Sequence, residues 1–356
     1  MKKITIALLT VALVASFCGC KKGPSPVKGK TEVAFISDGG TINDGAYNEN
    51  CYNGVKQYCD ENGVAYNNYI PDLGSIDSYL AQINKAVSDG AKVIVCPTYM
   101  MEEAVYQAAK EHAKVDFILV DGLPHNSDYT DYTIDENVMP ITFAEEEAGF
   151  LAGYAAVRDG YERLGFLGGM AEDSVIRYGY GFVQGADYAG IELGQKVYIA
   201  YTYLGTFSEN ENVHDMAAIF YDYSVKAICA CGGESDNSVL KAAEEKSGAV
   251  IGTDVDQSVS SPSVVFSCVK NYDKAVYNAL ADYYSGNFSG GAERHLTAAE
   301  DGISLTMDTA KFNEFSDIEY NAIYEELKTK KIVPYANTDV ATTAELNLVN
   351  TEIIYQ

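Results

Sequence analysis

Short apolar runs rich in β-branched residues alternate with longer amphipathic segments along most of this chain. In its first part, the runs predict strands over 32–37, 64–70, 93–96 and 117–120, and the segments between them predict helices over 46–62, 76–89 and 101–111. Gly63 and Gly90 follow two of these helices, as C-cap glycines do. This order of elements predicts a parallel sheet with helices on both faces.

The alternation then begins again. Further strands are predicted over 164–168, 197–203, 227–231 and 250–253, and helices over 178–189, 214–221 and 235–246. Residues 264–284 predict one more strand and helix that return to the first lobe, after which the chain passes back to the second. Two similar α/β halves joined by crossovers predict a hinged, two-lobed binding protein. We expect an N-terminal lobe of 31–138 with 258–290, and a C-terminal lobe of 139–257 with 291–356.

The N-terminus predicts a lipoprotein signal. Two lysines precede an apolar run over 4–17, which is too short to span a bilayer and fits a secretory signal. Gly19 before Cys20 fits lipoprotein cleavage, so we expect a signal peptide over 1–19, a lipid such as palmitate on Cys20, and a tether over 20–30. The protein is then membrane-anchored on the extracytoplasmic face. An ordinary signal peptide with incidental cysteines is the alternative.

Charge argues against some partners. The chain has 25 basic and 51 acidic residues, a net charge of −26, which repels nucleic acid and anionic membrane surfaces. An acidic, solvated surface that keeps the protein soluble accounts for this charge, so it says little about the ligand.

The cysteines beyond the signal form no CxxC or Cys/His cluster, so we expect no metal site. Disulfides are one alternative in a secreted chain. Several of these cysteines lie in apolar strand-like runs, where a thiol behaves as a small hydrophobic group, and we therefore expect buried free thiols. The set is Cys51, Cys59, Cys96, Cys229, Cys231 and Cys268.

Ligands of such sheets bind at the carboxyl ends of the strands. Polar, glycine-rich or aromatic residues follow each predicted strand here. The chain also contains the motifs SDGGxxNDxxYN (37–48), TF to EAGFLAGY (142–154), GFLGGM (165–170), GTFS (205–208), IGTDVDQS (251–258) and SCVK (267–270). Together, and in this order, the motifs resemble the basic membrane protein (Bmp) family of ABC-importer substrate-binding lipoproteins, whose best-understood members bind purine nucleosides. The resemblance runs from about residue 33 to 277.

The resemblance implies a type I periplasmic-binding-protein fold, with two Rossmann-like lobes and a three-crossover hinge. It also implies a monomer without cofactor that delivers a nucleoside to an ABC permease and its ATPase. Tyr47 and Phe207 match aromatic residues that stack on the base, although the family usually has Phe at the first position. A surface aromatic is the alternative for Tyr47.

Asp254 and Lys270 match residues that bind the ribose hydroxyls, and we expect them on the closing faces of opposite lobes. A helix N-cap and a solvated lysine are the alternatives. Asp38, Asn48 and Asp121 are expected at the base edge. Backbone N–H groups at Gly232 would approach the sugar, and plain turns are the alternative for Asp121 and Gly232. The loop 96–100 departs from the family pattern, so Tyr99 is a further candidate for the cleft.

Three other functions compete with nucleoside import. An enzyme is disfavoured, because the sequence has no GxSxG, no Cys/His pairing and only four scattered histidines. His125, in the loop 123–132, is a candidate for the mouth of the cleft, but we favour a solvated loop histidine. A surface adhesin would not need a small-molecule site, and a sugar-binding importer component of the same fold is separated only by the family resemblance.

Overall fold

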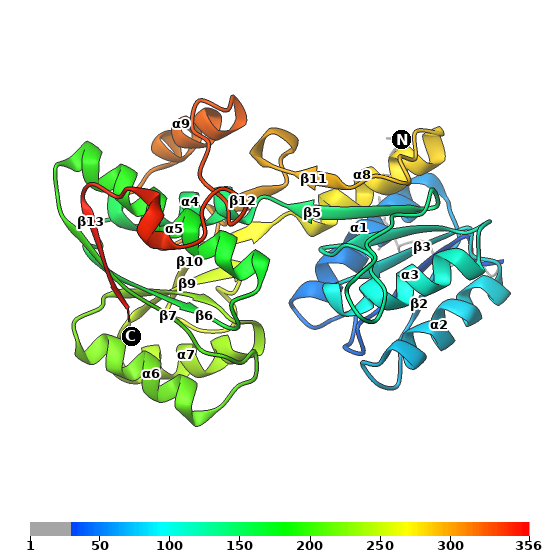
Figure 1. Ribbon diagram of the computed structural model, residues 1–356, viewed down its shortest axis with the longest axis horizontal. Coiled ribbons are helices and arrows are strands. Elements are labelled where there is room, and N and C mark those ends of the chain that lie inside the picture. The colour runs from blue at the N-terminus through cyan, green and yellow to red at the C-terminus, as the bar shows by residue number, and fades with distance from the viewer. Residues whose placement is uncertain (1–29, 356) are drawn as a thin grey trace, which may run out of the picture.

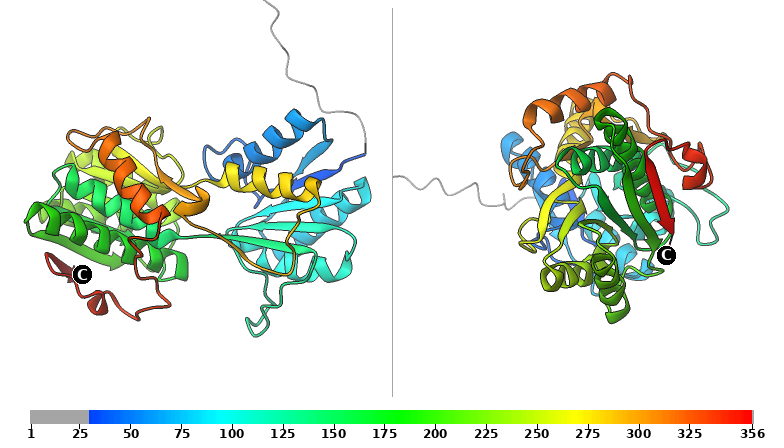
Figure 2. Two further views of the ribbon diagram at one scale, coloured as in Figure 1. Left: turned by 90° about the horizontal axis from the view of Figure 1, so that it is seen from above. Right: turned by 90° about the vertical axis from the view of Figure 1, so that its left-hand side faces the viewer.

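The computed structural model describes residues 30–355, so the expected signal peptide, Cys20 and nearly all of the tether lie outside the described residues. The described chain forms two lobes, each built on a largely parallel sheet (Figures 1 and 2). The predicted α/β fold with type I periplasmic-binding architecture is confirmed. Among the described residues, no helix is both long and apolar enough to cross a membrane.

The first lobe holds a six-stranded sheet with the order β11-β5-β4-β3-β1-β2. Its strands are β1 (Val33–Ile36), β2 (Tyr66–Tyr69), β3 (Val93–Pro97), β4 (Asp116–Val120), β5 (Val138–Phe143) and β11 (Arg294–Leu296). Its helices are α1 (Tyr47–Asn62), α2 (Ile76–Asp89), α3 (Glu102–Glu111) and α8 (Tyr272–Ser285), with a 3-10 turn, η1 (Tyr99–Met101). Gly63 and Gly90 end α1 and α2 in the left-handed conformation, as expected.

The second lobe holds a seven-stranded sheet with the order β12-β10-β9-β8-β6-β7-β13. Its strands are β6 (Arg163–Gly168), β7 (Val197–Tyr203), β8 (Ala227–Cys231), β9 (Ala249–Asp254), β10 (Val264–Lys270), β12 (Ile303–Leu305) and β13 (Thr351–Tyr355). Its α-helices are α4 (Glu145–Arg158), α5 (Asp173–Leu193), α6 (Glu211–Asp222), α7 (Asp236–Lys246) and α9 (Asp317–Lys328), with 3-10 turns η2 (Gly233–Ser235), η3 (Ala298–Glu300) and η4 (Thr343–Leu346).

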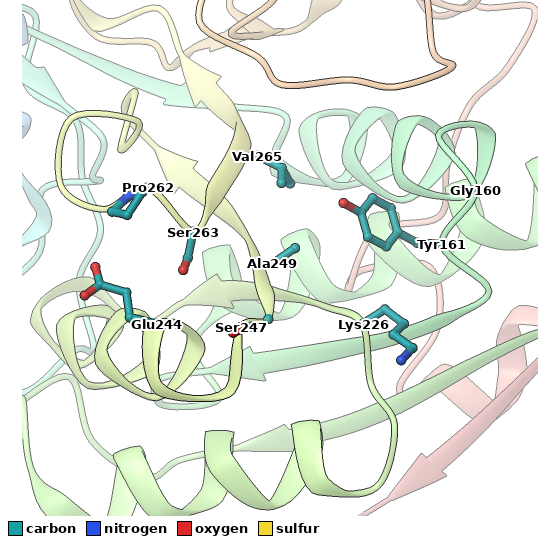
Figure 3. Close-up of a pocket in the computed structure, with 10 residues that line it drawn as sticks. Gly160, Tyr161, Lys226, Glu244, Ser247, Ala249, Pro262, Ser263 and Val265 are labelled. Atoms are coloured by element: carbon teal, nitrogen blue, oxygen red, sulfur yellow. The ribbon is translucent and has the colours of Figure 1, made fainter.

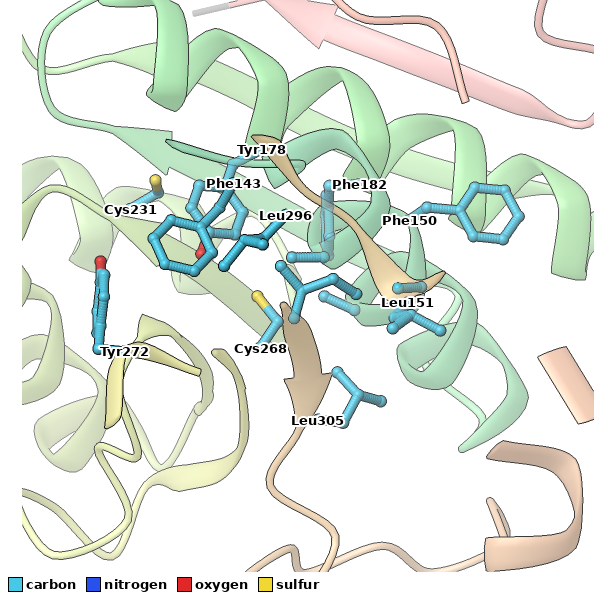
Figure 4. Packing of buried hydrophobic residues seen from close by; sticks show 14 of the residues in the cluster. Phe143, Phe150, Leu151, Tyr178, Phe182, Cys231, Cys268, Tyr272, Leu296 and Leu305 are labelled. Atoms are coloured by element: carbon cyan, nitrogen blue, oxygen red, sulfur yellow. The ribbon is translucent and has the colours of Figure 1, made fainter. Parts of the chain in front are cut away.

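Each sheet buries both faces, which explains why its strands are nearly continuous apolar runs. In the first lobe, Val33 and Phe35 point to the layer of α1 and α8, while Ala34 and Ile36 point to that of α2 and α3. The second sheet is covered by α4 and α5 on one face and by α6 and α7 on the other. One apolar cluster therefore runs through both lobes, and Figure 4 shows its part around Phe143.

The expected lobe boundaries are wrong for three strands. β5 pairs with β4 and β11 pairs with β5, so both belong to the first sheet, whereas β10 pairs with β9 in the second sheet. The boundaries assumed that a strand and the helix after it stay in one lobe. Within residues 30–355, the chain instead crosses between a strand and the next element, after β5, β10 and β11. The expected three crossovers are present, at shifted positions.

The prediction of buried free thiols is confirmed for the described cysteines. All six are free and buried. Burial raises the pKa of the Cys59 thiol to about 12, so this group stays protonated and unreactive at neutral pH.

Candidate functional site

The carboxyl ends of the two sheets face each other where the chain crosses between the lobes. β5 of the first lobe ends at Phe143 and leads into α4 of the second, while β10 of the second lobe ends at Lys270 and leads into α8 of the first. Residues that follow the strands of either sheet therefore lie at the interlobe boundary. We call this region the interlobe site.

Lys270 is the charged centre of this site. Its ammonium lies 2.9 Å from Asp121 of the first lobe, and 2.8 Å from Glu145 and 3.3 Å from Asp254 of the second. The side chain of Lys270 is only 2% exposed. Lys270 is therefore not a solvated lysine, and one buried cation joins carboxylates from both lobes.

Aromatic rings line the same cation. The ammonium lies 5.8 Å from the ring centroid of Phe143 and 5.6 Å from that of Tyr178, within cation–π range. Figure 4 shows Phe143 and Tyr178 together with Tyr272. The Tyr178 hydroxyl donates to Asp254 over 3.0 Å, and the Tyr272 hydroxyl donates to Asp121 over 3.1 Å.

The electrostatics follow from this packing. Burial by itself would lower the pKa of Lys270, but the three carboxylates outweigh it and hold the pKa well above its ordinary value. Burial raises the pKa of Glu145, and Lys270 and Arg177 together overcome that effect and lower it. We therefore assign an ammonium to Lys270 and a carboxylate to Glu145 at neutral pH.

The sequence led us to expect Asp254 and Lys270 on opposite lobes, and this expectation is wrong. Both belong to the second sheet, where β9 and β10 are paired neighbours. The residue that meets Lys270 from the first lobe is Asp121. Both aspartates have positive φ, 64° for Asp121 and 65° for Asp254, a conformation that is uncommon for non-glycine residues and is enriched at functional sites.

Tyr47 lies at the start of α1, on the first-lobe side. Its ring is 4.5 Å from the ring of Tyr272, and its hydroxyl is 3.5 Å from the carbonyl oxygen of Val120. Tyr47 is partly buried against the core, so it is not a freely exposed aromatic. Tyr272 therefore covers part of the Tyr47 ring, and the two planes are tilted by 47°.

Asp38 and Asn48 form a separate polar group. The Asn48 amide donates to Asp38 over 2.8 Å and to Asp44 over 2.9 Å, and its oxygen accepts from the backbone N–H of Asp38 over 3.1 Å. Asn48 is 2% exposed. The amide therefore holds the loop after β1 in place, and no polar contact joins this group to Lys270 among the described residues.

Phe207 belongs to the loop after β7 in the second lobe. A Cβ at Gly169 would lie 2.4 Å from two ring carbons of Phe207, so glycine is needed there to seat the ring. The Phe207 carbonyl oxygen accepts from the backbone N–H of Ser235 over 2.8 Å. Phe207 and Tyr47 make no ring contact with each other, so they are not stacked in this structure.

Gly232 is placed differently from the expectation. Its N–H donates to Asp236 over 2.8 Å and is therefore not free for a sugar. Asp236 is 3% exposed, and burial raises the pKa of its carboxyl to about 7. Gly232 supports the loop of the site through this bond.

The sequence reasoning missed Glu145, Tyr178, Tyr272 and Arg177. Glu145 is 1% exposed and pairs with Arg177 over 2.6 Å. The available signal was a glutamate two residues after the end of β5. The reading of His125 was also wrong, because it is buried and lies 3.1 Å from Glu102.

A broad surface hollow lies elsewhere (Figure 3). It lies at the opposite edge of the second sheet, because Lys226 precedes β8, Ala249 begins β9 and Ser263 precedes β10. None of the candidate residues lines it. The hollow is therefore separate from the interlobe site, which remains the candidate functional site.

A sequence profile described as "ABC transporter substrate-binding protein PnrA-like" matches residues 30–339. The chain belongs to the Bmp family. Among similar relatives, Basic membrane protein D of Borreliella burgdorferi is 27% identical over 326 residues, which cover 90% of each chain. The ABC transporter nucleoside-binding protein BmpA of Lactococcus lactis is 27% identical over 364 residues, covering 94% of this chain and 99% of the relative.

Solved structures show the same fold. An ABC transporter solute-binding protein from Aeropyrum pernix has a TM-score of 0.64 at 22% identity, covering 89% of this chain and 90% of that one. A solute-binding protein from Conexibacter woesei has a TM-score of 0.69 at 19% identity, covering 86% and 99%. These neighbours show the fold, and the family profile shows the role: this Bmp-family chain is an ABC transporter substrate-binding protein.

Proposed function

We propose that this Bmp-family protein binds a purine nucleoside at the interlobe site and delivers it to an ABC permease and its ATPase. A lipid on Cys20 would hold it at the extracytoplasmic face of the cell membrane. The observation that supports this class of ligand is the group of carboxylates and aromatic rings around Lys270. It offers carboxylates and an ammonium to vicinal hydroxyls, with aromatic residues in both lobes for a base.

The charge balance favours a neutral ligand. Asp121, Glu145 and Asp254 outnumber the cations Lys270 and Arg177, and both cations are already paired. A phosphate would add negative charge next to buried carboxylates, so a nucleoside fits and a nucleotide does not. The printed name of the Lactococcus lactis relative, a nucleoside-binding protein, supports the same class.

Calorimetric titration tests the proposal. Protein that begins after Cys20 keeps every described residue, and unfolding followed by refolding removes any co-purified ligand. We expect binding of adenosine, guanosine or inosine, weaker or no binding of cytidine, uridine and a sugar panel, and none of adenosine monophosphate. Binding of sugars alone would refute the nucleoside assignment and support the sugar-binding alternative.

Variants assign the site. Phe207→Ala should weaken purine-nucleoside binding about 5- to 150-fold, which corresponds to the roughly 1–3 kcal/mol of one stacked ring face. Asp254→Ala should weaken it as well, without unfolding the protein. Asp301→Asn, a surface change at a side chain that is 56% exposed, is the matched control. Wild-type affinity in both site variants would contradict the assignment.

A further inference from the structure

Tyr99 and Glu172 are a hydrogen-bond donor and an acceptor that have no partner within residues 30–355. The Tyr99 side chain is 50% exposed, and its hydroxyl makes no hydrogen bond there. Glu172 occupies the N-cap position of α5, yet its side chain makes no cap hydrogen bond. The two groups belong to different lobes.

Their positions place them on facing edges. Tyr99 comes two residues after β3, which lies between β4 and β1 in the first sheet. Glu172 comes four residues after β6, which lies between β8 and β7 in the second sheet. Because the carboxyl ends of the two sheets face each other, we expect a central loop of one lobe to lie opposite a central loop of the other.

The backbone before Tyr99 is strained. Thr98 has φ 75° and ψ 144°, a backbone conformation that β-branched residues rarely adopt. Its N–H donates to the carbonyl oxygen of Val120 over 2.8 Å, and its hydroxyl accepts from the N–H of Met100 over 3.2 Å. These bonds hold Thr98 buried, at 4% exposure, and leave the next side chain pointing outward. Such strain persists mainly where function uses it.

The charges around Tyr99 support an approach between the lobes. Burial raises the pKa of the Tyr99 hydroxyl, and the negative charge of Glu172 raises it further. Glu172 has a larger effect than Glu102 or Asp38, although these two belong to the same lobe as Tyr99. The phenol is therefore a protonated donor at neutral pH, within electrostatic reach of a carboxylate on the other lobe.

We propose that Tyr99 and Glu172 form a closure latch, in which the hydroxyl donates to the carboxylate when the lobes close and thereby retards ligand release. An O–H···O⁻ bond is short and strong, and it can form only in the closed state. The latch therefore adds differential affinity for that state, which is what shifts the equilibrium toward closure. Both are positioning residues. Their role rests on the proposed function only because it requires a ligand that the two lobes enclose.

Stopped-flow release of a bound purine nucleoside measures the latch. Tyr99→Phe keeps the ring and removes the hydroxyl, and Glu172→Ala removes the acceptor. Each should speed release about three- to tenfold and leave the association rate unchanged. The double variant should release no faster than the faster single variant. Tyr223→Phe, at another exposed tyrosine without a hydrogen-bonded hydroxyl, is the control. The latch would be overturned if the single variants released the nucleoside at the wild-type rate. It would also be overturned if the rate increase of the double variant were the product of the two single increases.

Cross-linking tests the latch without any ligand. The six cysteines of the described chain are buried, so Tyr99→Cys combined with Glu172→Cys adds the reactive pair in protein that begins after Cys20. A short bifunctional maleimide should join the two positions within one molecule. Tyr223→Cys with Glu172→Cys is the control pair. If both new thiols react singly but never become joined, the latch is wrong. If the two positions become cross-linked in a protein that binds no nucleoside, the proposed ligand is wrong and the latch is supported.

Discussion

Replacing Lys270 by methionine removes the charge that holds the interlobe site together. The change keeps an unbranched apolar side chain but leaves Asp121, Glu145 and Asp254 without the ammonium that lies 2.8 to 3.3 Å from each. Asp121 and Glu145 are 17% and 1% exposed at their side chains, so water cannot replace the cation fully. We expect Lys270→Met to destabilise the folded protein strongly.

The size of the stability loss depends on which partners the three carboxylates keep in Lys270→Met. Breaking a buried ion pair by removing one partner costs about 3–5 kcal/mol. Glu145 keeps Arg177 at 2.6 Å, and Asp254 is 37% exposed, so both retain partial compensation. We therefore expect a loss near 3 kcal/mol at pH 7, which is a large part of the 5–15 kcal/mol that stabilises a typical protein.

Urea unfolding of wild type and variant gives the loss as a difference in unfolding free energy. Lys328→Met is the matched control, because Lys328 and Asp301 are 34% and 56% exposed and such a pair contributes less than about 1 kcal/mol. The pKa of Glu145 is lowered in the folded state, so its stabilising effect is present above the ordinary value of 4.5 and is lost as pH falls. The gap between wild type and Lys270→Met should therefore shrink at low pH. Equal losses in the two lysine variants would refute this reasoning.

Three other features give simple tests. Gly153→Ala should cost roughly 1–3 kcal/mol in urea unfolding, because its Cβ would lie 2.0 Å from the Phe182 carbonyl oxygen of α5; unchanged stability would contradict this contact. Burial raises the pKa of Asp236 from 3.8 to about 7, so the wild-type protein loses stability as the pH rises from about 4 to 7. Asp236→Asn should therefore raise the melting temperature more at pH 8 than at pH 4. A thiol reagent should modify none of the six described cysteines in folded protein, and all six in denaturant.

Elements with clear periodicity were predictable. α2 was predicted over 76–89 and has these bounds, because its apolar positions recur at helical spacing and Gly90 ends it. α4 was not predicted as a helix, because 12 of its 14 residues are buried and a helix buried all round shows no apolar stripe. β13 was missed as well, since this short strand pairs only with β7, from a distant part of the chain.

By itself, the sequence determined the two α/β halves, the family, and which loops would carry polar and aromatic residues. These features depend on local periodicity and on motifs that stay close together along the chain. Only the tertiary structure decided that β10 belongs to the second sheet, that Asp254 lies beside Lys270, and that Asp121 meets Lys270 from the other lobe. Strand order and the partners of a buried charge depend on packing between residues some 150 positions apart. No local pattern encodes that packing.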